Sequence, residues 1–173
     1  MKRRLSLLII VVFVSMFFAA PFGAIAGPSI EQVEKNVENL WKKIRESQPH
    51  VTVVEFKKIM ESGKKLVLVD VRTDDEYAAG HLPGAIHINR GLIEWVMPKT
   101  VEDTDAKIYV YCRTGARSAF AVQRLQEMGY TSVTNIYDGF RGWVVAGYPV
   151  YNRHGEFTLK PQAFEKKDPY IVD

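Results

Sequence analysis

The sequence has almost no cysteine. Cys112 is the single cysteine among 173 residues, so no disulfide can form within one chain. The histidines show no metal-ligand spacing either, since His50, His87 and His154 stand far from one another and from Cys112. We therefore expect neither a metal nor a cofactor, and the single thiol has to be explained in another way.

A basic excess is also lacking once the first residues are set aside. The formal net charge is +3, but Lys2, Arg3 and Arg4 supply it, and no acidic residue precedes Glu31. The other 20 basic residues balance the 20 acidic ones. A nucleic-acid-binding domain would keep a basic excess in its folded part, so that class of partner is excluded.

Residues 1–26 have the pattern of an export signal. Basic residues precede an apolar run over 5–20, and Ala24 and Ala26 are the small residues that a signal peptidase reads. We expect cleavage after Ala26, a periplasmic location and no stable membrane span afterwards. An uncleaved membrane anchor is the alternative, although the run is short for a span of about 20 residues. No cysteine lies near the cleavage site, which excludes a lipoprotein.

Export makes the single cysteine informative. Exported proteins usually hold their cysteines in disulfide pairs, because their compartment is oxidising. An unpaired cysteine there is either a buried apolar side chain or a reactive thiol.

Residues 27–49 are predicted to form one amphipathic helix that Pro49 ends. Apolar residues recur three and four positions apart, with Trp41 beside the stripe and charged residues on the other faces. The stripe consists of Ile30, Val33, Val37, Leu40 and Ile44. We expect this helix to dock on the core of its own domain; a dimer seam is the alternative.

Residues 50–150 alternate between strand and helix patterns, which predicts an α/β domain around a mainly parallel, five-stranded sheet flanked by helices. Strands are expected over 51–56, 65–71, 84–89, 107–112 and 132–138. Helices are expected over 55–63, 73–80, 91–97, 118–129 and 139–147. Thr73 and Glu76 have the spacing of a capping box. Residues 151–173 are polar and are interpreted as a tail.

Three polar residues follow predicted strands and should meet at one edge of the sheet, where such folds bind ligands: Asp70, Cys112 and Asp138. The loop after Cys112 combines Arg113, Gly115 and Arg117 with the start of a helix. Loop N–H groups, the helix dipole and two arginines all favour a thiolate over a thiol and attract an anion. We therefore interpret Cys112 as a reactive nucleophile.

These motifs resemble the rhodanese sulfurtransferase family. "CRTGARS" (112–118) is similar to its active-site loop, and "LVDVR" (68–72), "EYAAGHLPGAIHI" (76–88) and "YDGFRGWVVAGYPV" (137–150) are similar to its other signatures, in the same order. One departure is Asp138, because the family often has two glycines where this chain has Asp138 and Gly139.

The resemblance implies a sulfurtransferase in which Cys112 carries a persulfide. It would take sulfur from thiosulfate or a similar small anion and pass it to cyanide or a thiol. The predicted substrate-binding residues are the rest of the loop: Arg113, Thr114, Gly115, Ala116, Arg117 and Ser118. Asp70, Arg72 and His81 are expected to support the loop rather than react.

Three other functions are compatible with a cysteine in such a loop. Cysteine phosphatases share the thiolate chemistry, but their arginine stands six residues after the cysteine, whereas Arg117 stands five after Cys112. A carrier that hands its persulfide to a specific exported partner protein stays open as the second hypothesis. An inactive scaffold is disfavoured because Cys112 is present.

Overall fold

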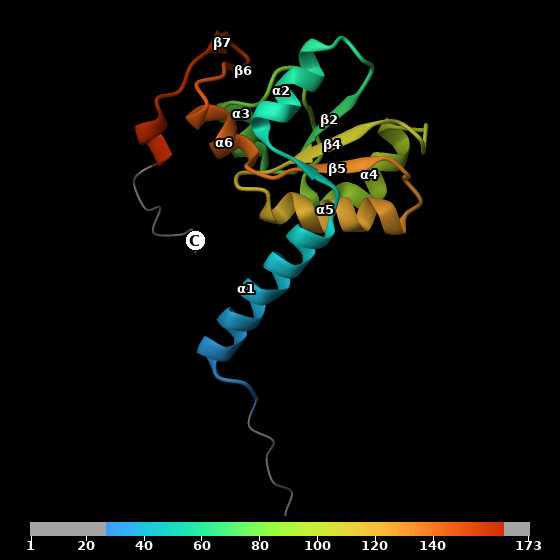
Figure 1. Ribbon diagram of the computed structural model, residues 1–173, viewed down its shortest axis with the longest axis vertical. Helices are drawn as coiled ribbons and strands as arrows, with labels where there is room; N and C mark the ends of the chain where they lie inside the picture. Colours follow the sequence, from blue (N-terminus) through green and yellow to red (C-terminus); the bar gives the residue numbers. More distant parts are fainter. Residues whose placement is uncertain (1–26, 165–173) are drawn as a thin grey trace, which may run out of the picture.

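The computed structural model describes residues 27–164. The predicted signal peptide (1–26) and the last part of the predicted tail (165–173) lie outside the described residues. The rest forms an α/β domain from which the first helix projects (Figure 1). Within residues 27–164, no helix is both long enough and apolar enough to cross a membrane.

A five-stranded sheet forms the centre of the domain. Its strands are β1 (His50–Val51), β2 (Val67–Asp70), β3 (Ile86–His87), β4 (Ile108–Tyr111) and β5 (Val133–Ile136). They lie in the order β1-β5-β4-β2-β3, and every neighbouring pair is parallel. The predicted parallel five-stranded sheet is confirmed.

Helices cover both faces of this sheet, so two hydrophobic clusters form. The helices are α2 (Val53–Glu61), α3 (Asp74–Ala79), α4 (Ile93–Thr100), α5 (Ala116–Glu127) and α6 (Gly139–Val145), and the short 3-10 helix η1 (Arg90–Leu92) precedes α4. Consecutive residues of β2 point to opposite faces: Val69 packs with Leu125 of α5, and Leu68 with Trp143 of α6. Burial on both faces explains the unbroken apolar run in that strand.

The first predicted strand is wrong in its extent. It was expected over 51–56, but β1 ends at Val51 and α2 begins at Val53. Thr52 accepts a hydrogen bond from the backbone of Glu55, and the Glu55 side chain accepts one from the backbone of Thr52. This capping box starts the helix early. The predicted capping box of Thr73 and Glu76 is present at the start of α3.

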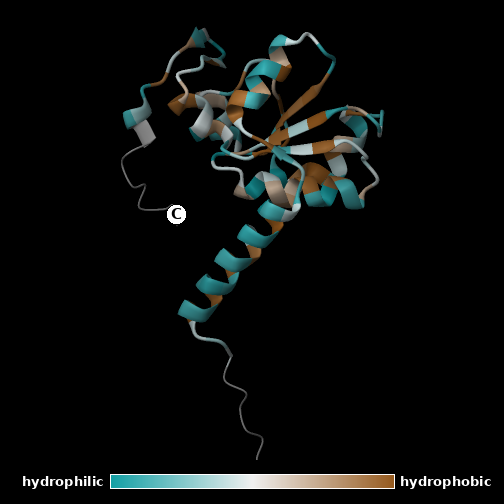
Figure 2. Cartoon of the chain, viewed as in Figure 1, coloured by the Kyte–Doolittle hydropathy of each residue, from teal (hydrophilic) through white to brown (hydrophobic). Residues whose placement is uncertain are grey.

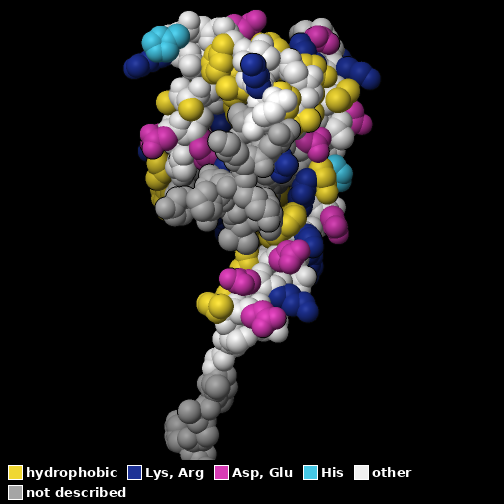
Figure 3. Space-filling model, turned by 90° about the vertical axis from the view of Figure 1, so that its left-hand side faces the viewer, with side chains coloured by type: hydrophobic (Ala, Val, Ile, Leu, Met, Phe, Trp, Pro, Cys, Tyr) yellow, Lys and Arg dark blue, Asp and Glu magenta, His cyan; other side chains and the backbone are white. Residues whose placement is uncertain are grey.

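The predicted docking of the N-terminal helix is also wrong. α1 (Ile30–Ser47) has no buried residue. Ile30 is 74% exposed and Val37 is 56% exposed. Only the C-terminal end of the helix meets the domain, next to α5, and its hydrophobic stripe runs along the projecting part (Figures 1 and 2). Figure 3 shows hydrophobic, acidic and basic side chains all reaching the surface there.

The stretch predicted as a tail begins with ordered structure. β6 (Val150–Asn152) and β7 (Gly155–Phe157) form an antiparallel hairpin, followed by the 3-10 helix η2 (Pro161–Phe164). His81 and Tyr151 exchange backbone hydrogen bonds of 2.8 and 2.9 Å, which join the hairpin to the end of α3. Tight turn residues and a few apolar contacts hold this segment, although its composition is polar.

Candidate active site

Cys112 lies at the carboxyl end of β4, at the bottom of a short loop that leads into α5. Its side chain is 1% exposed, and α5 begins four residues later at Ala116. The loop turns at Gly115, which has a φ of 85° and occupies the N-cap position of α5. No side chain caps this helix. The start of α5 thus follows the cysteine directly.

Two glycines allow the loop to pack tightly. A Cβ on Gly115 would lie 2.0 Å from the carbonyl oxygen of Tyr137, and a Cβ on Gly139 would lie 2.5 Å from that of Cys112. Both have positive φ angles, which glycine adopts without strain. Asp138 therefore stands where a side chain is tolerated, and Gly139 where it is not. The Asp138 carboxylate accepts a hydrogen bond from the backbone of Val53, at the start of α2.

The first turn of α6 fixes the carbonyl side of the loop. The backbone N–H of Phe140 donates to the carbonyl of Cys112 at 2.8 Å, and that of Arg141 donates to the carbonyl of Arg113 at 2.9 Å. On the donor side, the N–H groups of Thr114, Gly115 and Ala116 give no hydrogen bond to another described residue. Three N–H groups at the start of a helix can therefore bind an anion.

Ser118 and Asn135 form a short chain of hydrogen bonds beneath the loop. The Ser118 Oγ lies 2.7 Å from Asn135 Oδ1 and 3.5 Å from Cys112 Sγ. A hydroxyl has a single proton, so Ser118 donates to only one of these acceptors at a time. Asn135 also donates to the carbonyl of Gly115 at 3.1 Å. Both side chains are buried, and they connect β5 to the cysteine and to its loop.

Arg117 forms an ion pair with Glu76. Its two terminal nitrogens donate to the Glu76 carboxylate at 2.7 and 2.8 Å. Burial alone would raise the pKa of Glu76, but hydrogen bonds from Arg117 and Thr73 and the charges of Arg117 and Arg72 lower it to about 2. The same carboxylate caps α3. The hydrogen bond that Arg117 donates to Glu76 is the main cause that raises the pKa of Arg117, and the charge of Cys112 contributes as well.

The remaining loop residues are partly exposed to solvent. Arg113, Thr114 and Ala116 are half-buried. The six residues from Arg113 to Ser118 form the loop after Cys112 and the first residues of α5, and Ser118 Oγ lies 3.5 Å from the sulfur. Their predicted role in substrate binding stays a prediction.

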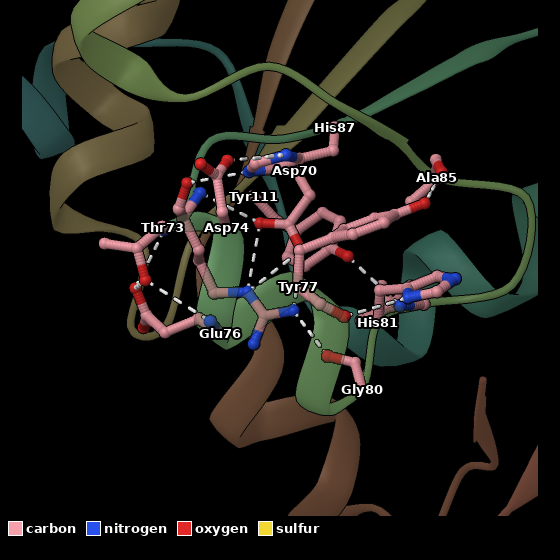
Figure 4. A network of polar contacts seen from close by, with 12 residues as sticks. Asp70, Thr73, Asp74, Glu76, Tyr77, Gly80, His81, Ala85, His87 and Tyr111 are labelled. Atoms are coloured by element: carbon pink, nitrogen blue, oxygen red, sulfur yellow. Dashed lines mark hydrogen bonds and ion pairs between the residues drawn. The ribbon is translucent and has the colours of Figure 1, made fainter. Parts of the chain in front are cut away.

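Asp70, Arg72 and His81 belong to a neighbouring polar network (Figure 4). The Arg72 guanidinium donates to both Asp70 oxygens at 2.6–3.0 Å and to the carbonyl of Gly80 at 2.6 Å. It also lies 4.0 Å from the ring centre of Phe140, whose N–H holds the Cys112 carbonyl. Asp70 and Arg72 are both buried, and this pair joins β2 to the end of α3.

His81 packs on Tyr77 of α3. Its ring stacks on Tyr77, with 3.9 Å between the ring centres, and its Nδ1 lies 3.1 Å from the Tyr77 carbonyl. These contacts place His81 in the turn after α3, where it also bridges to Tyr151. No group of three or more His, Cys, Asp or Glu side chains within residues 27–164 could hold a metal ion.

Sequence reasoning missed three residues around the loop: Arg45, Glu76 and Asn135. Glu76 was interpreted only as a helix cap. Asn135 carried a weak signal, because it is a polar residue between Val133 and Ile136 in a short predicted strand. Arg45 carried none, since its contact with Tyr137 joins residues 92 positions apart.

The family comparison agrees with this geometry. The sequence model of the rhodanese-like domain matches residues 52–146, more than half of the chain. The chain belongs to the rhodanese-like family. Its domain, from α2 to α6, is therefore the rhodanese-like part, and α1 precedes it.

Curated relatives of this rhodanese-like chain include sulfur-transfer proteins. A sulfurtransferase of Allochromatium vinosum is 37% identical over 90 residues, which cover 52% of this chain and 82% of the relative. YrkF of Bacillus subtilis, provisionally named a sulfur carrier protein, is 33% identical over 97 residues, which cover 56% of this chain. The match spans about half of YrkF, at 51% of its length.

A solved structure extends the comparison beyond the family domain. The polysulfide-sulfur transferase homodimer from Wolinella succinogenes has a TM-score of 0.61 at 26% identity. The match covers 71% of this chain and 92% of that one. Together, these relatives support a general role in sulfur transfer.

Proposed function

We propose that the protein is a sulfurtransferase that carries a sulfane sulfur as a persulfide on Cys112. One observation carries the proposal. A buried sulfur lies at the start of a helix, 3.5 Å from a serine hydroxyl, beside three N–H groups that bond to no other described residue. Such a loop stabilises a thiolate first and the negative end of a persulfide afterwards.

The reaction consists of two half-reactions. The Cys112 thiolate attacks the outer sulfur of a donor such as thiosulfate, forming a new S–S bond. The S–S bond of the donor breaks, and sulfite leaves with the electron pair. An acceptor, cyanide or a thiol, then attacks the terminal sulfur, and Cys112 leaves as a thiolate. Covalent catalysis of this kind gives ping-pong kinetics.

Thiosulfate is the proposed donor because the loop carries Arg113 and Arg117. The pair between Arg117 and Glu76 adds a condition, since a donor anion has to compete with a carboxylate held at 2.7 and 2.8 Å. An anion with two negative charges competes better than one with a single charge. This favours thiosulfate over a mercapto-acid with one carboxylate.

The test is the mass of the purified protein after it is incubated with thiosulfate and desalted. We expect the wild type to gain one sulfur atom and Cys112→Ser to gain none. Cyanide should then remove the added mass. A wild type that gains no sulfur from thiosulfate or polysulfide, or a Cys112→Ser variant that gains as much, would contradict the proposal.

A persulfide carrier for a specific protein partner is the second candidate, favoured by the similarity to YrkF. Turnover separates the two candidates. An enzyme discharges its persulfide rapidly to cyanide and to small thiols, whereas a carrier keeps it until the partner is added.

We further propose that the protein is exported and that residues 1–26 are removed. The support is the basic, apolar and small-residue pattern of that segment. Intact mass of the protein recovered from the periplasmic fraction tests this. A mature protein beginning at Gly27 is expected, and a full-length chain in the cytoplasmic fraction would contradict export.

A further inference from the structure

Arg45, in the last turn of α1, contacts Tyr137, which follows β5. One of its terminal nitrogens donates to the carbonyl of Tyr137 at 2.9 Å. Its guanidinium carbon lies 3.3 Å from the centre of the Tyr137 ring and 5.7 Å from that of Trp41. This part of α1 is therefore fixed to the residue that follows β5, although the rest of the helix projects away (Figure 1).

The carbonyl that Arg45 holds is the one that supports the loop. A Cβ on Gly115 would lie only 2.0 Å from the Tyr137 oxygen, so the backbone of Gly115 packs directly on this carbonyl. Gly115 is the turn between Cys112 and α5. The contacts thus run without a gap from α1 through Tyr137 to the loop around the sulfur.

Arg45 is poorly compensated for a half-buried cation. Within residues 27–164 it forms no ion pair, and its Nε is buried without a hydrogen-bond partner. A buried donor without a partner costs free energy, and an apolar side chain of similar size would pack there without that cost. The hydrogen bond to Tyr137 and the two aromatic rings hold the guanidinium in place without neutralising its charge.

We propose that Arg45 is a positioning residue of the sulfur-carrying loop and that its uncompensated charge adds to the positive potential at Cys112. Residue 45 precedes the family domain, which begins at residue 52, so the site takes this cation from outside that domain. The inference rests on the proposed function, because the loop it positions is the one that carries the sulfur.

The experiment compares two substitutions of Arg45 with a control on the same helix. Arg45→Gln keeps an N–H donor for Tyr137 but loses the charge, whereas Arg45→Lys keeps the charge but loses the planar group. Lys42→Gln removes an exposed charge that pairs only with Glu38, one turn away from the contact. Circular dichroism and melting temperature show that each full-length mature variant is folded.

The first readout is alkylation of Cys112, which requires no sulfur transfer. Iodoacetate and iodoacetamide have similar size and differ in charge, so the ratio of their rates reports the local potential. We expect Arg45→Gln to lower this ratio severalfold, because a positive charge near the loop attracts the anionic reagent and leaves the neutral one unaffected. Arg45→Lys and Lys42→Gln should stay within about twofold of the wild type.

The second readout is the single-turnover rate of sulfur loading from thiosulfate. Positioning predicts that both Arg45 variants load sulfur about tenfold more slowly, while Lys42→Gln loads at the wild-type rate. If Arg45→Lys loads sulfur at the wild-type rate, the positioning role is overturned. This test holds even when Arg45→Gln does not fold. An unchanged alkylation ratio in folded Arg45→Gln would overturn the electrostatic role. A wild type that does not load sulfur overturns the proposed function alone, since the alkylation ratio still tests Arg45.

Discussion

The helices α1 and α5 are both amphipathic, yet one projects from the domain and the other forms its core. The stripe of α5 is buried, with Ala121, Val122 and Leu125 in the cluster that covers one face of the sheet. The stripe of α1 has no buried member. Their first turns differ as well. Ser29 caps α1 with its own side chain, whereas α5 begins at Gly115 without a side-chain cap.

The difference shows what each helix depends on. α1 is defined by local features: a cap, a regular stripe and the ion pair between Lys42 and Glu38 on its surface. α5 is defined by what surrounds it, because its stripe faces the sheet and its first turn rests on β5 and α6. The N–H groups at the start of α5 stay available because no side chain caps them. The candidate anion site is therefore at the start of α5, whose position depends on the surrounding domain, and not at the start of α1.

The largest expected effect comes from the two glycines at the ends of α5. Gly115→Ala places a Cβ 2.0 Å from the Tyr137 carbonyl, whereas Gly129→Ala meets no atom within 4 Å. Both have a positive φ, so each substitution costs about 1–2 kcal/mol of stability, and the clash adds to this cost in Gly115→Ala. Only Gly115→Ala should also displace the loop and slow sulfur loading by a factor of about 100 or more. Equal loading rates in the two variants would show that the loop does not depend on this packing.

Truncation of one leucine in each stripe gives the next largest effect. Leu125→Ala removes a fully buried side chain and should lower the free energy of unfolding by about 2–5 kcal/mol. Leu40→Ala removes a side chain that is 50% exposed and should change it by less than about 0.5 kcal/mol. Denaturant unfolding measures both. A large loss in Leu40→Ala would mean that the stripe of α1 is covered in solution.

The smallest effect concerns two carboxylates, one that pairs with α5 and one on α1. The pKa of Glu76 is lowered to about 2, so its folded-state pKa lies below the ordinary value of 4.5. Its contribution to stability is therefore complete above pH 4.5 and is lost as the pH falls towards 2. Glu76→Gln should lower stability at pH 7 and flatten the loss between pH 4.5 and pH 2.

Glu38→Gln is the matched control for this prediction. Hydrogen bonding to Lys42 also lowers the pKa of Glu38, but the group is fully exposed and water screens the pair. We expect no measurable change in stability at either pH. Melting temperatures recorded from pH 7 down to pH 2 test both variants, and equal behaviour would mean that Arg117 and Glu76 do not pair in solution.

Local patterns predicted much of this fold. Apolar runs gave the strands, and the spacing of Thr73 and Glu76 gave the start of α3. The cysteine loop followed from one short stretch, because Cys112, Gly115 and Ser118 are neighbours in sequence. The part of the candidate site that could be predicted from the sequence is therefore this single loop.

Contacts between distant segments could not be predicted in this way. The periodicity of α1 identifies its apolar face but carries no information about what covers that face. The Tyr137 carbonyl accepts a hydrogen bond from Arg45, 92 positions away in sequence. Arg117 donates to Glu76, 41 positions away. Both partners depend on how the elements pack, which no local pattern of a single sequence contains.

The depth of Cys112 also limits which molecules can react with it. Only 1% of this residue is exposed, so a second protein cannot bring a thiol of its own to within a bond length of Sγ. The proposed persulfide would lengthen the side chain by about 2.05 Å. Under the proposed mechanism, this burial selects slender donors for the bare thiol, and a bulkier acceptor has to meet the sulfur after it has been loaded.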